Sequence, residues 1–202
     1  MAADKPEKPK GGPGAASAAP LLAEIQRLKA ELIDAEWKIA ELEARADVDP
    51  LLGIFNRRGF ARELTRSLAY VNRYGTAAAL MFIDLDLFKG INDQHGHAAG
   101  DALLKAVAAG LAAHVRASDV VARFGGDEFA VLMWNLDAAQ AAAKARELEN
   151  IVGRIAVPYG AARLSVGASA GVVPLLANSN PAEIIDAADK AMYARKKERR
   201  GA

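Results

Sequence analysis

The 202-residue sequence has no cysteine, and only 6% of its residues are aromatic. The lack of cysteine excludes disulfides, thiolate metal sites and cysteine nucleophiles. No run approaches the roughly 18 apolar residues that a membrane-spanning helix needs. An excess of one charge is missing too, because 26 Lys and Arg oppose 25 Asp and Glu. We therefore expect no nucleic-acid partner, no membrane span, and only local phosphate binding.

The N-terminal residues offer a weak likeness to a signal peptide. The stretch 11–23 carries no charge and follows three lysines. Its glycines and prolines, with only Leu21 and Leu22 as large apolar residues, make a poor hydrophobic region for such a peptide. Together with the absence of cysteine, this favours a cytoplasmic protein.

Composition and length divide the chain into three parts. Hydrophobic residues make up 52% and charged residues 25%, values typical of soluble globular proteins. Residues 1–20 are rich in proline and glycine and are expected to form a disordered tail. We predict a coiled-coil dimerisation helix over 21–46 and one globular domain over 47–202.

Residues 21–46 carry a heptad pattern. Apolar residues alternate at spacings of four and three at Leu21, Ile25, Leu28, Leu32, Ala35, Ile39, Leu42 and Ala46. This is the 3.5-residue period of a coiled-coil seam. Isoleucine at two a positions and leucine at two d positions favour a parallel two-stranded coil. The alternative is a single amphipathic helix packed on its own domain.

The remainder alternates between helical and strand patterns. We expect helices over 56–74, 97–116, 137–155 and 181–197, strands over 77–84, 120–124, 128–134 and 163–173, and a loop over 85–96. The strands 120–124 and 128–134 flank a Gly-Gly-Asp sequence and should form a tight hairpin. The pattern predicts a mixed α/β domain of the α+β type, with a central sheet backed by helices.

Two acidic residues occupy unusual positions. Asp84 ends an apolar strand, and Asp127 lies at the tip of the predicted hairpin. A carboxylate at the end of a buried strand is costly unless it is solvated, paired or bound to a metal. If the two strands are neighbours, their carboxylates make an oxygen-rich site suited to Mg²⁺ carrying nucleotide phosphates. The alternative is that both acids simply face solvent.

The sequence around Asp127 resembles that of a known family. Residues 123–129 read RFGGDEF, similar to the motif that gives GGDEF domains, the diguanylate cyclases, their name. Four further segments follow the family's order, DPLLGIFNRR at 49–58, DLDLFKGIND at 84–93, GHAAGD at 96–101 and ADKAMY at 188–193. The resemblance covers residues 47 to about 200. It implies a palm-like domain, similar to nucleotidyl cyclases and polymerases, with a mostly antiparallel sheet.

The resemblance also implies an activity and its alternatives. A diguanylate cyclase condenses two GTP molecules into cyclic di-GMP and two pyrophosphates, and it works as a homodimer because each domain holds one GTP. A non-catalytic cyclic di-GMP receptor or scaffold is the alternative from another class. A cyclase for mixed guanine–adenine dinucleotides is a third interpretation.

The family resemblance assigns the metal and catalytic roles to four residues. Asp84, Asp127 and the Leu85 carbonyl would hold two Mg²⁺ ions, with Mn²⁺ as a substitute. Two metals can stabilise the attacking oxygen and the leaving pyrophosphate. Asp127 is also the family's proposed proton acceptor, and Glu128 would be a supporting carboxylate.

The family's substrate-binding positions are also present. By resemblance they are Phe88, Lys89, Asn92, His97, Asp101, Gly125, Gly126, Lys196 and Arg200. Asn92 and Asp101 would read guanine, with His97 as a further contact, whereas the three cations would contact phosphates. The two glycines fit a turn that needs positive φ and close approach of a phosphate to the backbone.

A last resemblance concerns product inhibition. Arg116 and Asp119 match the family's RxxD inhibitory site for cyclic di-GMP, and Arg146 is a candidate secondary contact. Without the family context, an arginine and an aspartate three residues apart at a helix end form an ordinary cap or surface pair.

Overall fold

The computed structural model describes residues 18–201, without the side chains of residues 18–19, 40–45 and 200–201. It divides the chain into two compact units, Met1–Glu43 and Ala44–Ala202, which we describe separately. Residues 1–17 of the predicted tail lie outside the described residues. No described helix is long and apolar enough to cross a membrane.

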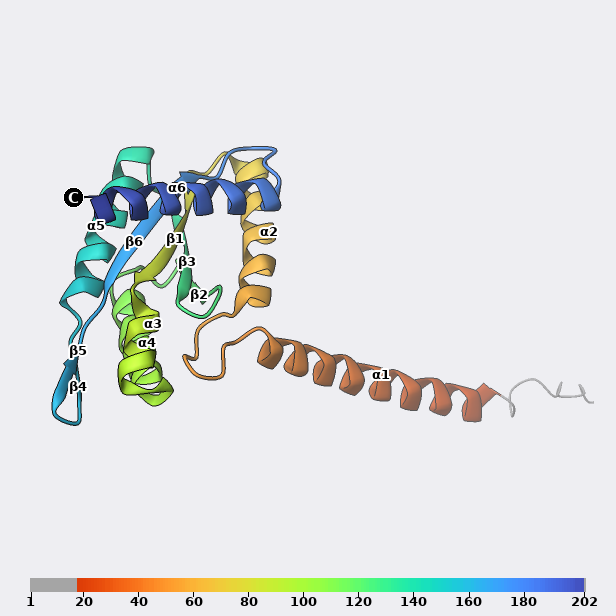
Figure 1. The fold of residues 1–202 in the computed structure, drawn as a ribbon. Helices are drawn as coiled ribbons and strands as arrows, with labels where there is room; N and C mark the ends of the chain where they lie inside the picture. The colour runs from red at the N-terminus through yellow and green to blue at the C-terminus, as the bar shows by residue number, and fades with distance from the viewer. Residues whose placement is uncertain (1–17, 202) are drawn as a thin grey trace, which may run out of the picture. The chain divides into compact units, whose positions relative to one another are not determined.

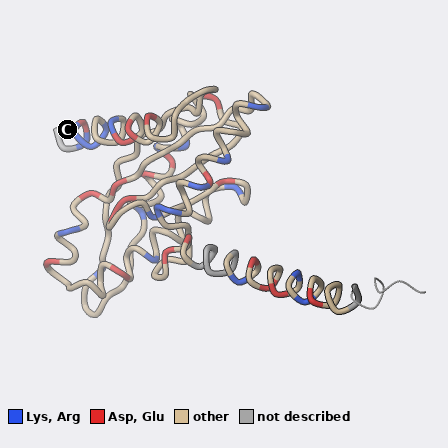
Figure 2. Tube along the Cα trace, turned by 90° about the vertical axis from the view of Figure 1, so that its right-hand side faces the viewer, with Lys and Arg blue, Asp and Glu red and all other residues tan. Residues whose placement is uncertain are grey.

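Helix α1 (Ala18–Ala46) includes the predicted heptads and begins three residues before the predicted start at Leu21. Pro20 fits there, because the first turn of a helix needs no N–H donor from proline. Both basic and acidic residues occur along its described part (Figure 2), and Arg27 pairs with Glu24 and Glu31 at 2.6 Å each. The described seam residues Leu21, Ile25, Leu28, Leu32 and Ile39 are 47–62% exposed.

The globular unit is built on a four-stranded sheet. Its strands are β1 (Ala78–Asp86), β2 (Val120–Arg123), β3 (Glu128–Trp134) and β6 (Gly167–Pro174), in the order β2-β3-β1-β6. Each pairing is antiparallel, which confirms the predicted α+β class. Strand β1 is buried from Ala78 to Leu85 because helices cover both faces of the sheet.

Two helix layers enclose the sheet (Figure 1). Helices α2 (Arg57–Tyr74) and α6 (Pro181–Gly201) pack on the face that carries Leu80, Phe82 and Leu132. Helices α3 (Phe88–His95), α4 (His97–Ala113) and α5 (Ala138–Arg154) lie on the other side, where Met81, Ile83 and Val131 point. Alternate residues of β1 therefore supply two separate cores.

Local sequence signals account for the helix boundaries. The Asn56 side chain accepts hydrogen bonds from the N–H groups of Arg58 and Gly59 and so begins α2. Gly75 ends the same helix in the left-handed conformation, with φ of 66°. Asp137 and Gln140 form a capping box at the start of α5.

Three predicted segments differ from the structure. Residues 85–96, expected to be a loop, contain α3, whose apolar residues are too few to show a helical period. The predicted strand 163–173 is divided, because β4 (Val157–Tyr159) and β5 (Ala162–Leu164) form a separate hairpin before β6. Helix α6 continues beyond the predicted end at residue 197 to Gly201.

Candidate functional site

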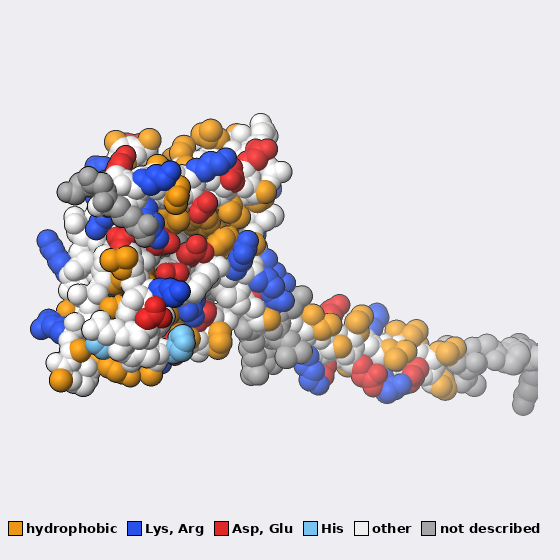
Figure 3. All heavy atoms as spheres, in the orientation of Figure 1, with side chains coloured by type: hydrophobic (Ala, Val, Ile, Leu, Met, Phe, Trp, Pro, Cys, Tyr) orange, Lys and Arg blue, Asp and Glu red, His pale blue; other side chains and the backbone are white. Residues whose placement is uncertain are grey.

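The acidic residues of the site meet where the pairing of β1 with β3 ends. Asp84 on β1 lies opposite Glu128 on β3, and Asp127 directly precedes Glu128. The N–H of Leu85 donates to the Asp127 carbonyl at 3.2 Å, which fastens the hairpin turn to the end of β1. The sheet register therefore brings together the two aspartates that the sequence singled out. Figure 3 shows acidic side chains, with basic ones beside them, gathered on the visible face of this unit.

Burial and repulsion between neighbouring carboxylates raise the pKa values of two acids, Asp127 and Glu128. Burial, and then the charge of Asp84, raises the pKa of Asp127 above its ordinary value. Burial raises the pKa of Glu128 as well, with further contributions from Asp84, Asp127 and Asp189. Close carboxylates with raised pKa values favour a cation between them.

Lys196 balances part of the negative charge of these carboxylates. Nζ of Lys196 on α6 donates to Oδ1 of Asp84, and their side chains are only 17% and 12% exposed. The predicted phosphate contact therefore lies directly beside the predicted metal ligand. The side chain of Arg200, the other predicted cation of α6, lies outside the described part.

The residues present fit an oxygen-ligated divalent cation. Asp84 and Asp127 offer carboxylates, and Leu85 lies beyond the last β1 residue paired with β3. In the part of the chain that the structure describes, no three His, Cys, Asp or Glu residues form a complete metal cage. Mg²⁺ suits such a site because it is commonly bound by one or two carboxylates, with water and substrate phosphates completing its shell.

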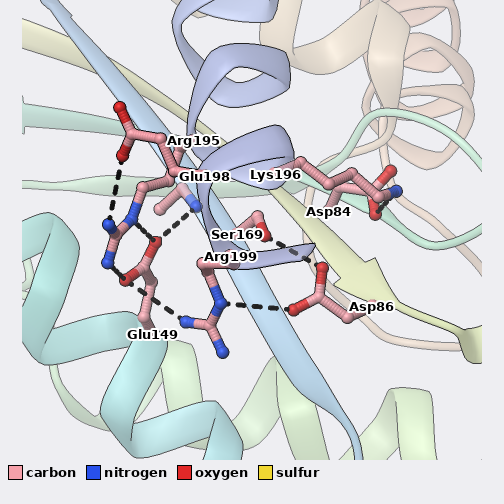
Figure 4. A network of polar contacts seen from close by, with 9 residues as sticks. Asp84, Asp86, Glu149, Ser169, Arg195, Lys196, Glu198 and Arg199 are labelled. Carbon is pink, nitrogen blue, oxygen red and sulfur yellow. Dashed lines mark hydrogen bonds and ion pairs between the residues drawn. The ribbon is translucent and has the colours of Figure 1, made fainter. Parts of the chain in front are cut away.

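Buried ion pairs position helix α6 (Figure 4). Glu149 on α5 is 5% exposed, and it accepts hydrogen bonds from Arg195 Nε at 3.0 Å, Arg195 Nη2 at 2.9 Å and the N–H of Ala170 at 2.9 Å. Burial opposes ionisation of Glu149, but these donors and the charge of Arg199 lower its pKa overall. Glu149 thus holds the part of α6 that carries Lys196.

Asp86 makes the second anchor of α6. Its carboxylate accepts from Ser169 Oγ at 2.9 Å and lies 3.7 Å from Arg199 Nε. Asp86 belongs to β1 and Ser169 to β6, so α6 is tied across two strands (Figure 4).

Arg123 holds the Gly-Gly turn. Its guanidinium donates to the Gly126 carbonyl at 2.8 Å and the Gly125 carbonyl at 3.1 Å, and Nη1 reaches Asp49 Oδ2 at 3.2 Å. The sequence analysis quoted Arg123 within the motif but assigned it no role. Its position two residues before a glycine pair was the available signal, since glycines bring no side-chain donors of their own to a turn.

The predicted positive φ at the two glycines is wrong. Among the described glycines, positive φ occurs only at Gly53, Gly75, Gly96 and Gly160. Gly125 lies close against Glu128, so an added Cβ would force the end of the Glu128 side chain to move. An added Cβ on Gly126 would meet nothing within 4 Å, which leaves its backbone open to a ligand.

The predicted guanine readers line one cavity beside this turn. It has a volume of about 270 Å³, and its walls are Phe88, Lys89, Asn92, His97, Asp101, Leu104, Arg123, Gly126 and Asp127. Helices α3 and α4 supply the amide of Asn92 and the carboxylate of Asp101. Gly96, with φ of 83°, makes the turn between these helices. One cavity thus joins Asp127 to Asn92 and Asp101, which are 35 and 26 positions away from it in the sequence.

The RxxD pair lies at a second place, at the start of β2. Asp119 accepts from the N–H of Arg116 at 2.9 Å and from the N–H of Trp134 at 3.1 Å. Both residues line a hollow of about 570 Å³. From α5 this hollow receives Gln140, Ala143, Lys144 and Glu147, whereas the predicted contact Arg146 is exposed and is not part of its wall.

The sequence of the globular unit shows to which protein family the chain belongs. The family described as "Diguanylate cyclase, GGDEF domain" matches residues 46–202. The chain belongs to this GGDEF family. The match includes every predicted site residue and begins at the last residue of α1.

Named relatives agree with this GGDEF assignment. The chain is 39% identical over 189 residues to the diguanylate cyclase TpbB of Pseudomonas aeruginosa, covering 90% of this chain and 41% of TpbB. It is 36% identical over 156 residues to the diguanylate cyclase DgcP of the same species, covering 76% of this chain and 23% of DgcP. The chain thus spans less than half the length of these relatives.

A solved structure shares the architecture of both units. The coiled coil and GGDEF domain of DgcB from Caulobacter crescentus, crystallised with cyclic di-GMP, matches with a TM-score of 0.75 at 26% identity. The match covers 88% of this chain and 95% of the DgcB chain. This neighbour and the family match confirm the expected palm-like GGDEF fold.

Proposed function

We propose that this GGDEF protein is a diguanylate cyclase that condenses two GTP molecules into cyclic di-GMP and two pyrophosphates. The observation that carries the proposal is the position of Asp127. It lines the cavity that contains Asn92 and Asp101, and its pKa responds to the charge of Asp84. A nucleotide with its base in this cavity therefore has a carboxylate site for its phosphates within reach.

The cavity chemistry favours guanine. The Asp101 carboxylate can accept both N1–H and N2–H of guanine, a pair of donors that adenine lacks. The Asn92 amide adds a donor and an acceptor, and His97 lies on the same wall. An unpaired buried polar group costs about 1–3 kcal/mol, so GTP should bind better than ATP by about tenfold or more.

The phosphates would lie between the turn and α6. Lys89 lines the cavity, and Lys196 donates a hydrogen bond to Asp84. Each of these two cations could therefore contact the phosphates. Phe88 is 6% exposed and fixes the start of α3, while the backbone of Gly126 stays open for an approaching oxygen. Arg200 is proposed as a further phosphate contact from its place in the sequence.

Asp84, Asp127 and the Leu85 carbonyl would hold Mg²⁺, or Mn²⁺ in its place. Bound metal would lower the pKa of the attacking 3′-hydroxyl and neutralise charge on the phosphates. Glu128 would support the turn: its carbonyl accepts the N–H of Phe124 at 2.8 Å, and its carboxylate lies beside Gly125. Asp127 is also the proposed proton acceptor, but this is its lesser role, because a metal-bound carboxylate is a poor base and the metal already acidifies the hydroxyl.

The reaction needs two protomers, because the 3′-hydroxyl of one GTP must reach the α-phosphate of the other. The exposed seam of α1 supports a parallel homodimer through residues 21–46, and tethering would raise the effective concentration of the second domain. DgcB was crystallised with its coiled coil, which is a further argument for this role. Because GTP is supplied in the cytoplasm, we propose that the protein works there.

We propose that the product inhibits the enzyme through Arg116 and Asp119. Arg116 is exposed and can grip phosphate or guanine, and Asp119 is held in place by two backbone donors. Arg146 would contribute only if a second molecule brings it to the product.

The test is synthesis by the full chain after bound nucleotide has been stripped. Wild type with GTP and Mg²⁺ should yield cyclic di-GMP by chromatography and mass spectrometry, whereas Asp127→Asn, which keeps the side-chain shape, should yield none. ATP offered with GTP should give no mixed product. A folded, dimeric wild type that binds cyclic di-GMP but makes none would replace this proposal with the receptor function.

A further inference from the structure

The ion pair of Lys196 and Asp84 joins two residues to which the proposed function gives different partners. Asp84 would hold the divalent cation, and Lys196 would contact the phosphates of GTP. In the structure the two bind each other, because Nζ of Lys196 donates to Oδ1 of Asp84 (Figure 4). Both side chains are largely enclosed. A bound metal–nucleotide complex would therefore give each of them a new partner.

The Lys196 ammonium is the counter-ion of the acidic site. Among the residues that the structure describes, it is the one hydrogen-bond donor of the Asp84 carboxylate, and it makes no second hydrogen bond. Its charge also reaches the neighbouring aspartate. Burial and the charge of Asp84 raise the pKa of Asp127, and the charge of Lys196 partly offsets this rise. One ammonium thus acts on both carboxylates that would bind the metal.

The backbone of α6 is held on both sides of Lys196. Arg195 binds the buried Glu149 at 2.9 Å. Arg199 lies 3.7 Å from Asp86 on β1. Lysine carries its ammonium on a flexible four-carbon stem, and its N–H donors can turn to another acceptor. The ammonium of Lys196 can therefore change partners while the helix stays in place.

A divalent cation and the ammonium would compete for Asp84. Each of them alone stabilises the carboxylate, but together they repel each other, and charges in an enclosed site are weakly screened. The triphosphate of GTP removes this conflict, because its oxygens can accept the ammonium and coordinate the metal at the same time. The metal would therefore bind best when the nucleotide arrives with it.

We propose that the Lys196 ammonium is a tethered counter-ion of Asp84 that opposes binding of a divalent cation alone and is drawn away by the triphosphate of GTP. This inference rests on the proposed function, since it uses the same metal ligand and the same phosphate contact. Its consequence is that the metal and the nucleotide bind cooperatively, each raising the affinity for the other by the same factor. The site takes up Mg²⁺ together with GTP rather than before it.

The first measurement is Mn²⁺ binding to the nucleotide-free full chain, followed by the electron paramagnetic resonance signal of free Mn²⁺. Lys196→Met removes the ammonium and keeps an unbranched stem. We expect it to bind Mn²⁺ about tenfold more tightly than wild type, within the usual range of coupling between two ligands. Lys89→Met and Lys197→Met lose the same charge and should bind Mn²⁺ like wild type. Lys89 lines the base cavity, and Nζ of Lys197 lies 4.6 Å from the centre of the Tyr193 ring.

The second measurement is binding of 3′-deoxy-GTP in saturating Mg²⁺ by calorimetry. This analogue lacks the attacking hydroxyl, so it binds without being converted. Lys196→Met and Lys89→Met should each bind it about tenfold more weakly than wild type, because each loses a charged phosphate contact. Lys197→Met should bind it like wild type. Only Lys196→Met should therefore strengthen binding of the metal alone and weaken binding of the nucleotide complex.

The outcomes separate this inference from the proposed function. Equal Mn²⁺ affinity of wild type and Lys196→Met, equal strengthening by all three variants, or no measurable Mn²⁺ binding by either wild type or Lys196→Met would overturn the inference. The proposed function still stands in these cases if wild type binds 3′-deoxy-GTP. No binding of 3′-deoxy-GTP by wild type would overturn both. If circular dichroism shows that Lys196→Met is unfolded, Lys196→Gln takes its place, because glutamine removes the charge and keeps an N–H donor for Asp84.

Discussion

Replacing Glu149 should uncouple helix α6 from the sheet and lower the stability of the GGDEF domain. Glu149 is 5% exposed and serves three donors, two from Arg195 and one from the N–H of Ala170. Leucine fills the same space but accepts no hydrogen bond. Glutamine keeps the acceptor for Ala170 and loses only the charge, so the two variants separate the backbone contact from the ion pair.

The structure sets the expected size of each effect. In Glu149→Leu the N–H of Ala170 loses its acceptor inside the protein, at about 1–3 kcal/mol, and the charge-assisted bonds to Arg195 are lost as well. Arg195 is 37% exposed and can return to water, which reduces the second contribution. We expect a loss of about 3–4 kcal/mol for Leu and about 1–2 kcal/mol for Gln. In a domain of this size the former lowers Tm by about 10 °C.

Urea unfolding in the Trp37→Phe background, followed through Trp134, measures both losses for the domain. The pKa of Glu149 is lowered from its ordinary 4.5, so its stabilisation is complete above that pH and disappears as pH falls through the lower value. The difference between wild type and Glu149→Gln should shrink accordingly in acid. Equal losses for Gln and Leu, or a difference that grows in acid, would refute the reasoning.

Three further substitutions test single contacts. Gly125→Ala should displace the Glu128 carboxylate and reduce kcat for cyclic di-GMP synthesis at least tenfold while far-UV circular dichroism stays unchanged. Gly100→Ala places a Cβ against Asn92 Oδ1, so the KM for GTP should rise by about tenfold, and an unchanged KM would contradict the guanine assignment. Leu87→Gly should stabilise the domain by about 0.5–1 kcal/mol in the same urea assay, because Leu87 has φ of 59° and a side chain that is 77% exposed.

Much of the fold was predictable where local chemistry dominates. The apolar run of β1 ends at Asp84 because a charged residue is costly in a strand covered on both faces. Asn56, Gly75 and Asp137 mark helix ends by their side-chain or backbone preferences. Helix α3 was missed because, among its described residues, only Phe88 is buried, and one residue gives no period.

The sequence proposed the residues of the candidate site but not the contacts that support them. The motif around residues 123–129 identified the carboxylates by family resemblance, yet the register that sets Asp84 opposite Glu128 depends on tertiary packing. The partners Asp84 and Lys196 are 112 positions apart, and Glu149 and Arg195 are 46 positions apart. Such pairs leave no periodic signal in a single sequence. For the same reason the motif includes Arg123 but does not indicate that its guanidinium binds the carbonyls of the glycine turn.

The contacts of Arg123 join the start of the domain to the turn that carries Asp127. The segment that follows α1 is fixed by Asp47, which binds Arg58 and Arg62 at 2.8 and 2.5 Å, and by Asp49, which binds Arg123. The N–H of Arg123 also donates to the Phe55 carbonyl at 2.8 Å, while its guanidinium holds the two glycine carbonyls. A shift of residues 47–55 must therefore move Arg123 or break its bonds to the turn. Because no other side chain among the described residues donates to those carbonyls, the position of residues 47–55 bears directly on the geometry of the turn that carries Asp127.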